Sequence, residues 1–490
     1  MIQLAPTDVL YQAPLLVLVL TGLILILAEA FTRGVRRDFL MSLSVLGCLG
    51  AMAASAVLYR AVGDASVDLF GGMLVVDRLS YVMSGLFAGA TAISAMLIAG
   101  HQRMHRWEVG ELYGLMLIAA AGASMLSMAG SLVTIFLGIE MMSIAIYDFM
   151  AARRGSRVGS EAAMKYFLMG AFSSGILVYG IALIYGATGT MNIAEIGAFA
   201  SESPNTPLLL AGMLLMLISF AFKIGAVPFH MWAPDTYDGA PTPITGFLAS
   251  VAKAAGVIAA VRVLSEAFGG DVIPYGRMGW ASLLAAIAAI TMTVGNLAAL
   301  RQESIKRMLA YSSIGHAGVI LVGVVAIGVG AADVATPAVV FYLIAYSATT
   351  LGAFGLVAWI GSRGEERLRI DQWSGLATAH PLAALAMTLF LLSLGGIPPL
   401  AGFFGKFYVF SAAMQAYDQQ LLWLVVVGVL NSVLSIFYYL RVVMVMYFRE
   451  PEGAFAPTRS VATVIAIGIC AFLVVKMGIL PGGWMSLAGG

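Results

Sequence analysis

Long apolar runs alternate with short polar connections along the whole chain. A helix needs about 20 apolar residues to cross the hydrocarbon core of a bilayer. On this basis the pattern predicts fourteen spanning helices, near residues 11–31, 39–59, 75–99, 109–129, 131–150, 161–186, 207–227, 243–267, 279–299, 304–329, 334–360, 381–411, 420–448 and 461–480. We therefore expect an all-α, polytopic membrane protein, and we number these predicted helices 1 to 14 in chain order.

The composition supports this class. Residues are 61% hydrophobic and 10% charged, whereas soluble domains carry about 25% charged residues. The two cysteines, Cys48 and Cys470, fall in apolar segments and indicate neither a disulfide framework nor a metal cluster. The first apolar run lacks a preceding basic region, so we expect it to be a retained helix and not a cleaved signal.

Basic residues gather in the connections that follow odd-numbered helices. Those after helices 1, 3, 5, 9, 11 and 13 hold sixteen: Arg33, Arg36, Arg37, Arg103, Arg106, Arg153, Arg154, Arg157, Arg301, Lys306, Arg307, Arg363, Arg367, Arg369, Arg449 and Arg459. The connections after even-numbered helices hold only Arg60 and Arg277, with Arg262 close by. Because Lys and Arg favour cytoplasmic loops, we expect both termini outside the cytoplasm.

Lysine is distributed differently from arginine. Four of the six lysines, Lys165, Lys223, Lys253 and Lys406, fall within predicted spanning segments, and Glu140 lies in the middle of helix 5. Arginine keeps its proton, whereas a buried lysine can release it. The pattern indicates cations that exchange protons inside the membrane. The alternative is a set of static buried ion pairs, for which there are too few carboxylates.

Lys223 lies beside a break in helix 7. Pro228 follows it by five residues, in SFAFKIGAVPFHMWAPDTYDGAPTP. Transporters use such broken helices to expose backbone to a polar cavity. His230 and Asp235, beyond the break, either line a route by which protons enter or cap the broken helix.

Helix 12 repeats this motif, in SLGGIPPLAGFFGKF. Gly395 precedes Pro398 by three residues, as Gly225 precedes Pro228. Both breaks fall in the fourth helix of a five-helix block, and an odd number of helices inverts the second block. We predict an N-terminal three-helix segment at 1–100, repeats at 108–268 and 277–448, and a final helix at 458–490. The two prolines are 170 residues apart, and the same offset from Glu140 leads to about residue 310 in helix 10, which carries His316, so we expect Glu140 and His316 to be topological equivalents.

Three stretches resemble one known family. FKIGAVPFHMWAPDTYDGAPTP, ESIKRMLAYSSIGHAG and GIPPLAGFFGKF look like the antiporter-like membrane subunits of proton-pumping NADH:quinone oxidoreductase, respiratory complex I. The resemblance covers residues 75–450. It is greatest to the subunit N branch of bacteria, because helix 12 carries a lysine, no lateral helix follows helix 14 and three helices precede the repeats.

The resemblance implies roles for individual residues. Glu140 would pair with Lys223, Lys253 would be the connecting lysine of helix 8, and Lys406 would be the terminal lysine of helix 12. His316 would bridge Lys253 and Lys406. A further residue, Lys165, would modulate the Glu140–Lys223 pair.

The resemblance also implies partners. They would be neighbouring antiporter-like and small membrane subunits in a bacterial inner membrane, and redox partners holding NADH, FMN, iron–sulfur clusters and quinone. This chain would bind no cofactor or metal, since it has no phosphate-binding loop and no cysteine cluster. A subunit of a multi-subunit Na⁺/H⁺ antiporter, or of a membrane hydrogenase, remains an alternative.

Other polar residues have simpler interpretations. His101 and His105 have the i,i+4 spacing of a metal site, but a solvated loop is the better interpretation. Asp77 and Arg78 could form an interfacial ion pair without function. Tyr438 and Tyr439 are interpreted as packing residues or as members of the aromatic belt at the membrane interface.

Overall fold

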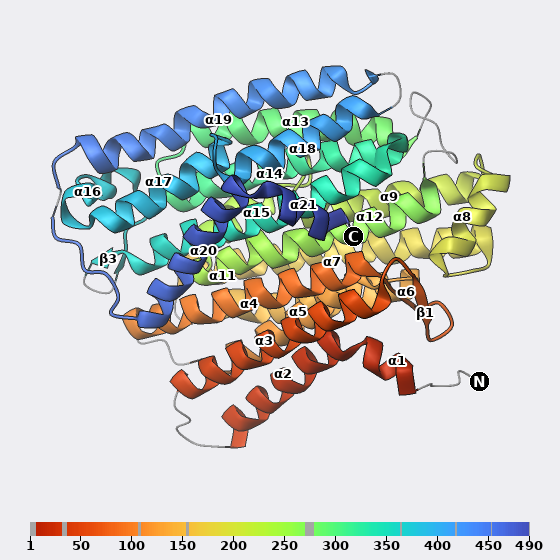
Figure 1. Ribbon diagram of the computed structural model, residues 1–490, viewed down its shortest axis with the longest axis horizontal. Helices are drawn as coiled ribbons and strands as arrows, with labels where there is room; N and C mark the ends of the chain where they lie inside the picture. The colour runs from red at the N-terminus through yellow and green to blue at the C-terminus, as the bar shows by residue number, and fades with distance from the viewer. Residues whose placement is uncertain are drawn as a thin grey trace.

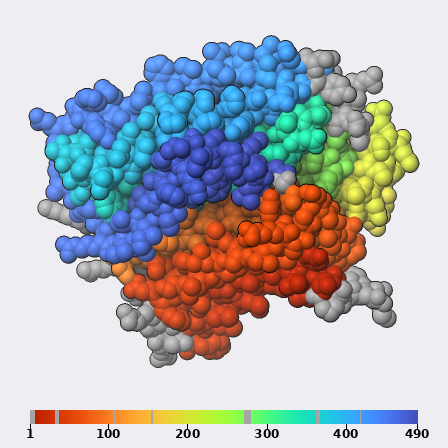
Figure 2. Space-filling model, viewed as in Figure 1, coloured from red at the N-terminus to blue at the C-terminus, as the bar shows by residue number. Residues whose placement is uncertain are grey.

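A computed structural model of the chain describes residues 6–31, 37–105, 109–152, 156–269, 279–362, 365–416, 419–451 and 453–489. Long helices lie side by side in one bundle (Figure 1). The N-terminal helices α2 (Ala13–Phe31) and α3 (Arg37–Val62) form one flank, and α19 (Leu422–Phe448) forms the opposite flank. In the space-filling view the N-terminal and C-terminal parts occupy opposite halves of the visible face (Figure 2).

Each predicted span coincides with a helix or a pair of helices, so the all-α membrane fold is confirmed. Besides α2, α3 and α19 they are α4 (Arg78–His105), α5 (Glu111–Ser127), α6 (Leu132–Ala151), α7 (Arg157–Thr188), α9 (Pro207–Ile224), α11 (Thr242–Phe247), α12 (Lys253–Phe268), α13 (Trp280–Leu300), α14 (Ile305–Ala326), α15 (Ala332–Trp359), α17 (Pro381–Gly395), α18 (Ala401–Gln415) and α20 (Val461–Ile479). Among the described residues, eleven helical segments are long and apolar enough to cross a membrane. One of these, Ile305–Trp359, covers two predicted spans, while α5 and α17 are shorter apolar helices. The predicted block boundaries remain a prediction.

Short elements cover the two ends of the bundle. A hairpin of β1 (Val67–Leu69) and β2 (Leu74–Val76) lies near α8 (Ile193–Glu202) at one end. The opposite end carries the hairpin of β3 (Gly361–Ser362) and β4 (Glu365–Glu366), with the 3₁₀ turn η3 (Ile370–Trp373) and α16 (Leu376–Ala379). The remaining short helices are α1 (Pro6–Tyr11), α10 (Trp232–Gly239) and α21 (Pro481–Gly489).

Two membrane helices are broken in the same way. α9 ends at Gly225, whose φ is 80°, and Ala226 N–H donates to Ala221 O at 2.8 Å. α17 ends at Gly396, whose φ is 82°, and Ile397 N–H donates to Leu392 O at 3.0 Å. Both are Schellman endings, in which only glycine adopts the left-handed backbone without a steric penalty.

The second break corrects the predicted alignment of the repeats. Gly396, not Gly395, takes the place of Gly225, because it is the glycine with the matching positive φ. The offset between the breaks is therefore 171 residues. The sequence could not distinguish the two alignments, because in GGIPP each glycine stands three residues before a proline.

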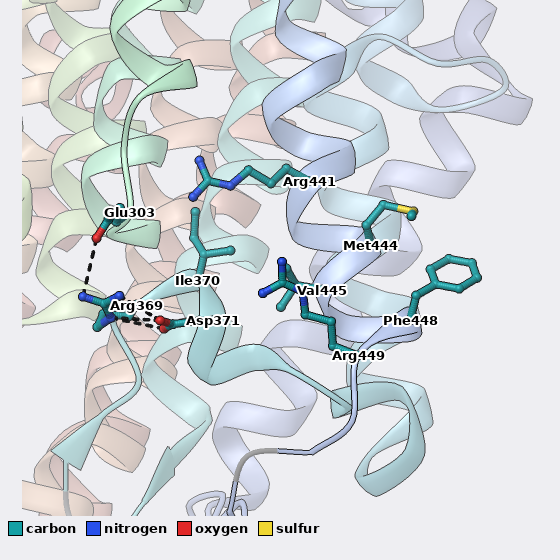
Figure 3. A pocket seen from close by; sticks show the side chains of 9 residues that line it. All are labelled: Glu303, Arg369, Ile370, Asp371, Arg441, Met444, Val445, Phe448 and Arg449. Atoms are coloured by element: carbon teal, nitrogen blue, oxygen red, sulfur yellow. Dashed lines mark hydrogen bonds and ion pairs between the residues drawn. The ribbon is translucent and has the colours of Figure 1, made fainter.

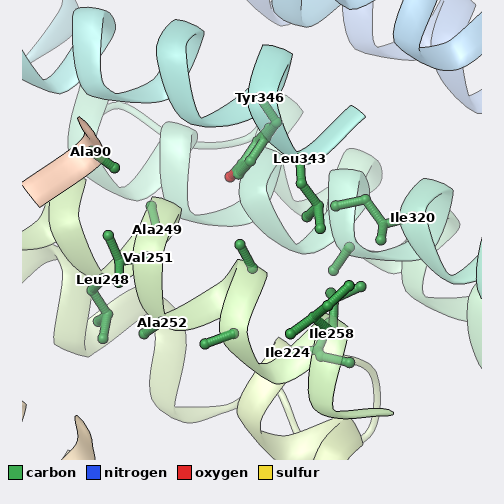
Figure 4. Close-up of a cluster of buried hydrophobic side chains, with 14 of the residues drawn as sticks. Ala90, Ile224, Leu248, Ala249, Val251, Ala252, Ile258, Ile320, Leu343 and Tyr346 are labelled. Atoms are coloured by element: carbon green, nitrogen blue, oxygen red, sulfur yellow. The ribbon is translucent and has the colours of Figure 1, made fainter. Parts of the chain in front are cut away.

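The middle of the bundle is formed by α11, α12, α14 and α15. The apolar window of Thr242–Phe268 is completely buried, whereas that of α2 is 22% buried. Apolar side chains such as Leu248, Ile258, Ile320 and Leu343 fill the space between these helices (Figure 4). The central helices also carry titratable groups, so these groups lie where the bundle is most thoroughly shielded.

The backbone is irregular beside these groups. A π-helical turn, η1 (Leu248–Ala252), immediately precedes the lysine that begins α12. A second π-helical turn, η2 (Ile327–Ala331), contains a kink at Val329 and Gly330 and joins α14 to α15. Such π turns inside helices are frequent at functional sites.

Candidate functional site: a row of buried lysines

Lys223 lies in the last turn of α9, beside the break, and its side chain is buried. Its Nζ donates to Ser143 Oγ of α6 at 2.6 Å and lies 6.0 Å from the centre of the Tyr166 ring. The stem packs on Gly256 of α12, where an added Cβ would lie 3.2 Å from Lys223 Cγ. Gly256 is one helical turn after Lys253, so Lys223 touches the helix that carries the next lysine.

Glu140 of α6 is half-buried, and its Oε1 accepts a hydrogen bond from Ser174 Oγ of α7. No atom pair joins Glu140 and Lys223 within 4.0 Å in the described residues, so the structure does not contain the implied direct ion pair. Because Glu140 precedes Ser143 by one turn on the same face of α6, it lies beside the hydroxyl that Lys223 contacts.

Lys253 begins α12 and is buried. Its Nζ donates to Ser313 O of α14 at 2.5 Å and also to Ser313 Oγ. The ring of Tyr346 lies 5.5 Å from the ammonium, and the hydroxyl of Tyr237 is 3.4 Å from Ser313 Oγ. Within the described part of the chain, no carboxylate forms an ion pair with Lys253. The cation is held by one hydroxyl, one carbonyl and an aromatic face.

His316 lies one turn beyond Ser312 and Ser313 on α14 and is buried. Its Nδ1 is 2.7 Å from the Tyr342 hydroxyl, and its Nε2 is 3.1 Å from the Tyr439 hydroxyl. The Tyr439 hydroxyl also shares a hydrogen bond with Ser312 Oγ. Hydrogen bonds therefore join Ser312, Tyr439 and His316, and Ser312 is the chain neighbour of Ser313, which binds Lys253.

Lys406 of α18 is buried, and its Nζ donates to Gly395 O at 3.0 Å. This carbonyl belongs to the last turn of α17, where the helix dipole favours a cation. His316 and Lys406 line one small cavity of about 10 Å³, which is close to the space that one water needs. Its wall also contains Asn296, Asn431 and Tyr438, which are joined by hydrogen bonds of 2.9 and 3.2 Å.

Lys165 does not lie in this row. Its side chain is 42% exposed and pairs with Glu161 and Asp235, each at 2.8 Å. Arg307 also binds Asp235, at 2.9 Å. The hydrogen bond from Lys165, followed by that from Arg307, lowers the pKa of Asp235. Asp235 thus forms a surface ion cluster and makes no capping hydrogen bond to α10.

Asp77 and Arg78 do not pair with each other. Asp77 binds the buried Arg262 of α12 at 2.6 Å, and Arg78 binds Asp64 at 2.5 Å. This corrects the predicted pair, because Asp77 precedes α4 and faces α12, whereas Arg78 faces the connection that follows α3.

His101 is buried, and its Nδ1 lies 3.5 Å from Glu366, so it is not in a solvated loop. The side chain of His105 lies outside the described residues. Lys306 is also buried and donates to Ala240 O at 2.6 Å. Among the described residues, no group of three or more His, Cys, Asp or Glu side chains could hold a metal ion.

Sequence reasoning missed the neutral members of the row. Tyr439 is not merely a packing residue, since its hydroxyl joins Ser312 to His316. Ser143 and Ser313 accept hydrogen bonds from Lys223 and Lys253, but serines are common in this chain and nothing in the sequence distinguishes these two. Ser312 and Ser313 lie on α14, and Tyr438 and Tyr439 lie on α19. The sequence did not indicate that these two pairs meet, because only the tertiary structure brings the two helices together.

Comparisons with known proteins agree on one family. Residues 129–435 match the family described as NADH:quinone oxidoreductase/Mrp antiporter, TM. The chain is 46% identical to NADH-quinone oxidoreductase subunit N 1 of Sorangium cellulosum, over 96% of this chain and 95% of that relative. It is 41% identical to NADH-quinone oxidoreductase subunit N of Trichlorobacter lovleyi, over 96% and 93% of the two chains.

Solved structures share the fold. A chain of respiratory complex I from Thermus thermophilus with bound aureothin is 31% identical, with a TM-score of 0.80 over 97% of this chain and 100% of that chain. A chain of the Mrp complex from Dietzia is 22% identical, with a TM-score of 0.85 over 99% and 97% of the two chains. The second likeness concerns the fold alone.

Proposed function

The chain belongs to the NADH:quinone oxidoreductase/Mrp antiporter family of membrane subunits, in the subunit N branch of the NADH-quinone oxidoreductases, and we propose that its buried lysines carry pumped protons. In this proposal partner subunits transfer electrons from NADH to quinone. The present chain moves protons across the bilayer in response, as one subunit of an H⁺-translocating enzyme.

One observation carries the proposal: Lys223, Lys253 and Lys406 are all buried, and none forms an ion pair with a carboxylate among the described residues. Each ammonium is bound instead by neutral oxygen atoms. Burying a charged lysine without a counterion costs several kcal/mol of free energy. Removing its proton to give the neutral amine costs about the same. Such groups are suited to exchanging protons, whereas a static structural pair would contain a matching acid.

The interaction of Glu140 with Lys223 would have an energy suited to a switch that drives proton pumping. A Glu–Lys pair at about 4 Å interacts by about 4 kcal/mol at an effective dielectric constant of 20. Moving one charge against 100 mV costs about 2.3 kcal/mol. Forming or breaking the Glu140–Lys223 pair therefore involves an energy comparable to pumping one proton.

The contacts of Glu140 and Lys223 support the proposal of an open position of this switch. Glu140 is turned to Ser174, and Lys223 is turned to Ser143. When Glu140 pairs with Lys223, the lysine keeps its proton. When a neighbouring subunit draws Glu140 away, the proton on Lys223 moves to Lys253.

The second half of the route follows the hydroxyls of α14. Lys253 shares Ser313 with Tyr237, and the adjacent Ser312 leads through Tyr439 to His316. A single water in the cavity that His316 shares with Lys406 would complete the connection. Reciprocal hydrogen bonds among hydroxyls and imidazole allow the proton to pass without a free ion in the apolar core.

We propose an orientation for the chain in the membrane and assign the cofactors to other subunits. The end with β3, η3 and α16 faces the cytoplasm of a bacterial cell, since it carries the arginine-rich connections, and both termini are periplasmic. Of the basic residues behind this assignment, several lie outside the described residues: Arg33, Arg36, Arg106, Arg153, Arg154, Arg277 and Arg363. NADH, FMN, iron–sulfur clusters and quinone bind to partner subunits.

Purification of the intact assembly tests the proposed function. We expect the tagged chain to bring with it NADH dehydrogenase activity that reduces quinone and acidifies one side of sealed vesicles. The antiporter alternative, which shares this fold, predicts Na⁺-dependent proton exchange without redox activity. Recovery of the second activity alone would overturn the proposal.

A further inference from the structure

A second polar site lies at the rim of the bundle, where α13 ends, α14 begins and α19 ends (Figure 3). It is a cavity of about 510 Å³, which is within the range of cavities that hold small organic ligands. The lining residues are Glu303, Arg369, Ile370, Asp371, Arg441, Met444, Val445, Phe448 and Arg449. None of them belongs to the lysine row, so proton transfer does not explain the cavity.

One face of α19 forms a wall of this cavity. Arg441, Met444, Val445 and Phe448 follow one another in α19 at intervals of three, one and three residues, and Arg449 comes directly after the helix ends. The two guanidinium groups extend toward the cavity, and Phe448 points away from it (Figure 3). Phe448 is 75% exposed and Met444 is 53% exposed, so apolar surface adjoins the two cations.

The opposite wall holds one cation between two carboxylates, a net charge of −1. Arg369 binds Asp371 at 2.8 Å and Glu303 at 3.5 Å. This guanidinium lowers the pKa of Asp371, so the carboxylate stays charged and the group stays paired. The Glu303–Arg369–Asp371 cluster therefore contributes a rigid polar edge but no free cation.

The cations of α19 have no such partners. Arg441 donates to Leu300 O at 3.4 Å and to Gln302 O at 3.1 Å, which are carbonyls at the end of α13. In the described residues, no carboxylate lies within 4.0 Å of the guanidinium of Arg441 or Arg449. Two positive charges thus border an open cavity at the level where a helix leaves the membrane.

We propose that this cavity binds the phosphate group of an anionic phospholipid, with Arg441 and Arg449 as its ligands. The planar guanidinium forms paired hydrogen bonds with phosphate oxygens. Basic pockets between membrane helices on the cytoplasmic side bind lipid head groups. The acyl chains would lie along Met444 and Phe448, whose exposed apolar side chains a free phosphate ion or an acidic peptide would leave uncovered.

Lipid binding by the intact, delipidated complex tests this site. Vesicles of phosphatidylcholine containing phosphatidylglycerol supply the lipid, and mass spectrometry counts the phosphatidylglycerol retained on the complex. Arg449→Gln should weaken retention about fivefold, the loss expected for one arginine near a membrane surface. Arg459→Gln is the matched control, because Arg459 is exposed in the connection that follows α19 and does not line the cavity.

Three outcomes would overturn the inference. Equal retention in the wild type and both variants would mean that Arg449 binds no lipid. Displacement of phosphatidylglycerol by an equal concentration of inorganic phosphate would identify a site for the free ion. A photoreactive group at position 449 that cross-links to a partner subunit, and not to lipid, would assign the cavity to a protein interface. Arg449 makes no hydrogen bond to the described residues, so its replacement leaves the fold of α19 intact.

Discussion

The imidazole of His316 is 3.1 Å from the hydroxyl of Tyr439, a residue 123 positions later in the chain. The same hydroxyl contacts Ser312, one turn before the histidine. The hydroxyl of Tyr439 on α19 therefore joins Ser312 and His316, which both lie on α14. This contact lies between Lys253 and Lys406 on the proposed route.

Tyr439→Phe removes that hydroxyl and keeps the ring. Buried groups left without a hydrogen-bond partner cost about 1–3 kcal/mol. We therefore expect proton pumping to slow by about tenfold, which corresponds to 1.4 kcal/mol. Tyr113→Phe is the control, since its buried hydroxyl bonds to Gln102, away from the row. Comparable pumping in the two variants, measured in proteoliposomes, would exclude Tyr439 from the route.

Ser174→Ala removes the hydroxyl that holds Glu140 away from Lys223. Hydrogen bonds to charged groups contribute about 1.5–3 kcal/mol, so the loss should shift Glu140 toward Lys223 by about tenfold or more. Lys223 would then keep its proton, and we expect pumping to slow. Ser173→Ala removes a neighbouring hydroxyl that bonds to Ser219 and should pump normally. Equal rates in both serine variants would contradict the switch.

Gly396→Ala and Gly225→Ala form a matched pair. The two glycines have nearly the same positive φ, so each alanine should lower the stability of the subunit by about 1–2 kcal/mol. Only the Cβ at 396 would meet a lysine, at 2.9 Å from Lys406 Cδ, whereas the Cβ at 225 has nothing nearer than Trp232, at 3.9 Å. We expect both variants to unfold at lower temperature and Gly396→Ala alone to pump more slowly. A similar pumping rate in both would show that the position of Lys406 does not matter.

Asp77→Asn tests a structural ion pair. Arg262 is 5% exposed, and loss of Asp77 would leave its buried charge with Glu266, at 3.3 Å, and the Ser127 carbonyl, at 3.0 Å, as its partners among the described residues. Breaking such a pair costs about 3 kcal/mol or more. Asp64→Asn breaks the exposed pair with Arg78 and should cost less than about 1 kcal/mol. Thermal unfolding of the solubilised complex measures both, and equal unfolding temperatures would refute the assignment.

The fold was predictable because its signals are local. Apolar runs of membrane length locate helices such as α2 and α13 directly, and Pro228 and Pro399 mark the two breaks. The register of the repeat was not predictable, because Gly395 and Gly396 are equally spaced from the two prolines. Only the backbone conformation, with a positive φ at Gly396, decides between them.

The site was predictable in its charged members only. A lysine such as Lys253 is conspicuous in apolar sequence, whereas Ser313 is not. Which carboxylate a lysine meets depends on how helices rotate against each other, and for that reason Lys165 binds Asp235 and not the surroundings of Glu140. Tertiary packing decided these contacts, and no spacing within one helix encodes them.

The most direct test of the proton route is the ratio of protons translocated to NADH oxidised in proteoliposomes of the intact complex. Lys253→Met and Lys406→Met keep the length of the side chain and remove the exchangeable proton. Lys476→Met is the control, since Lys476 lies near the end of α20 beside Phe472 and Trp484. The account predicts a lower ratio in the first two variants, with the complex assembled, and the wild-type ratio in the third. A wild-type ratio in Lys253→Met and Lys406→Met would contradict it.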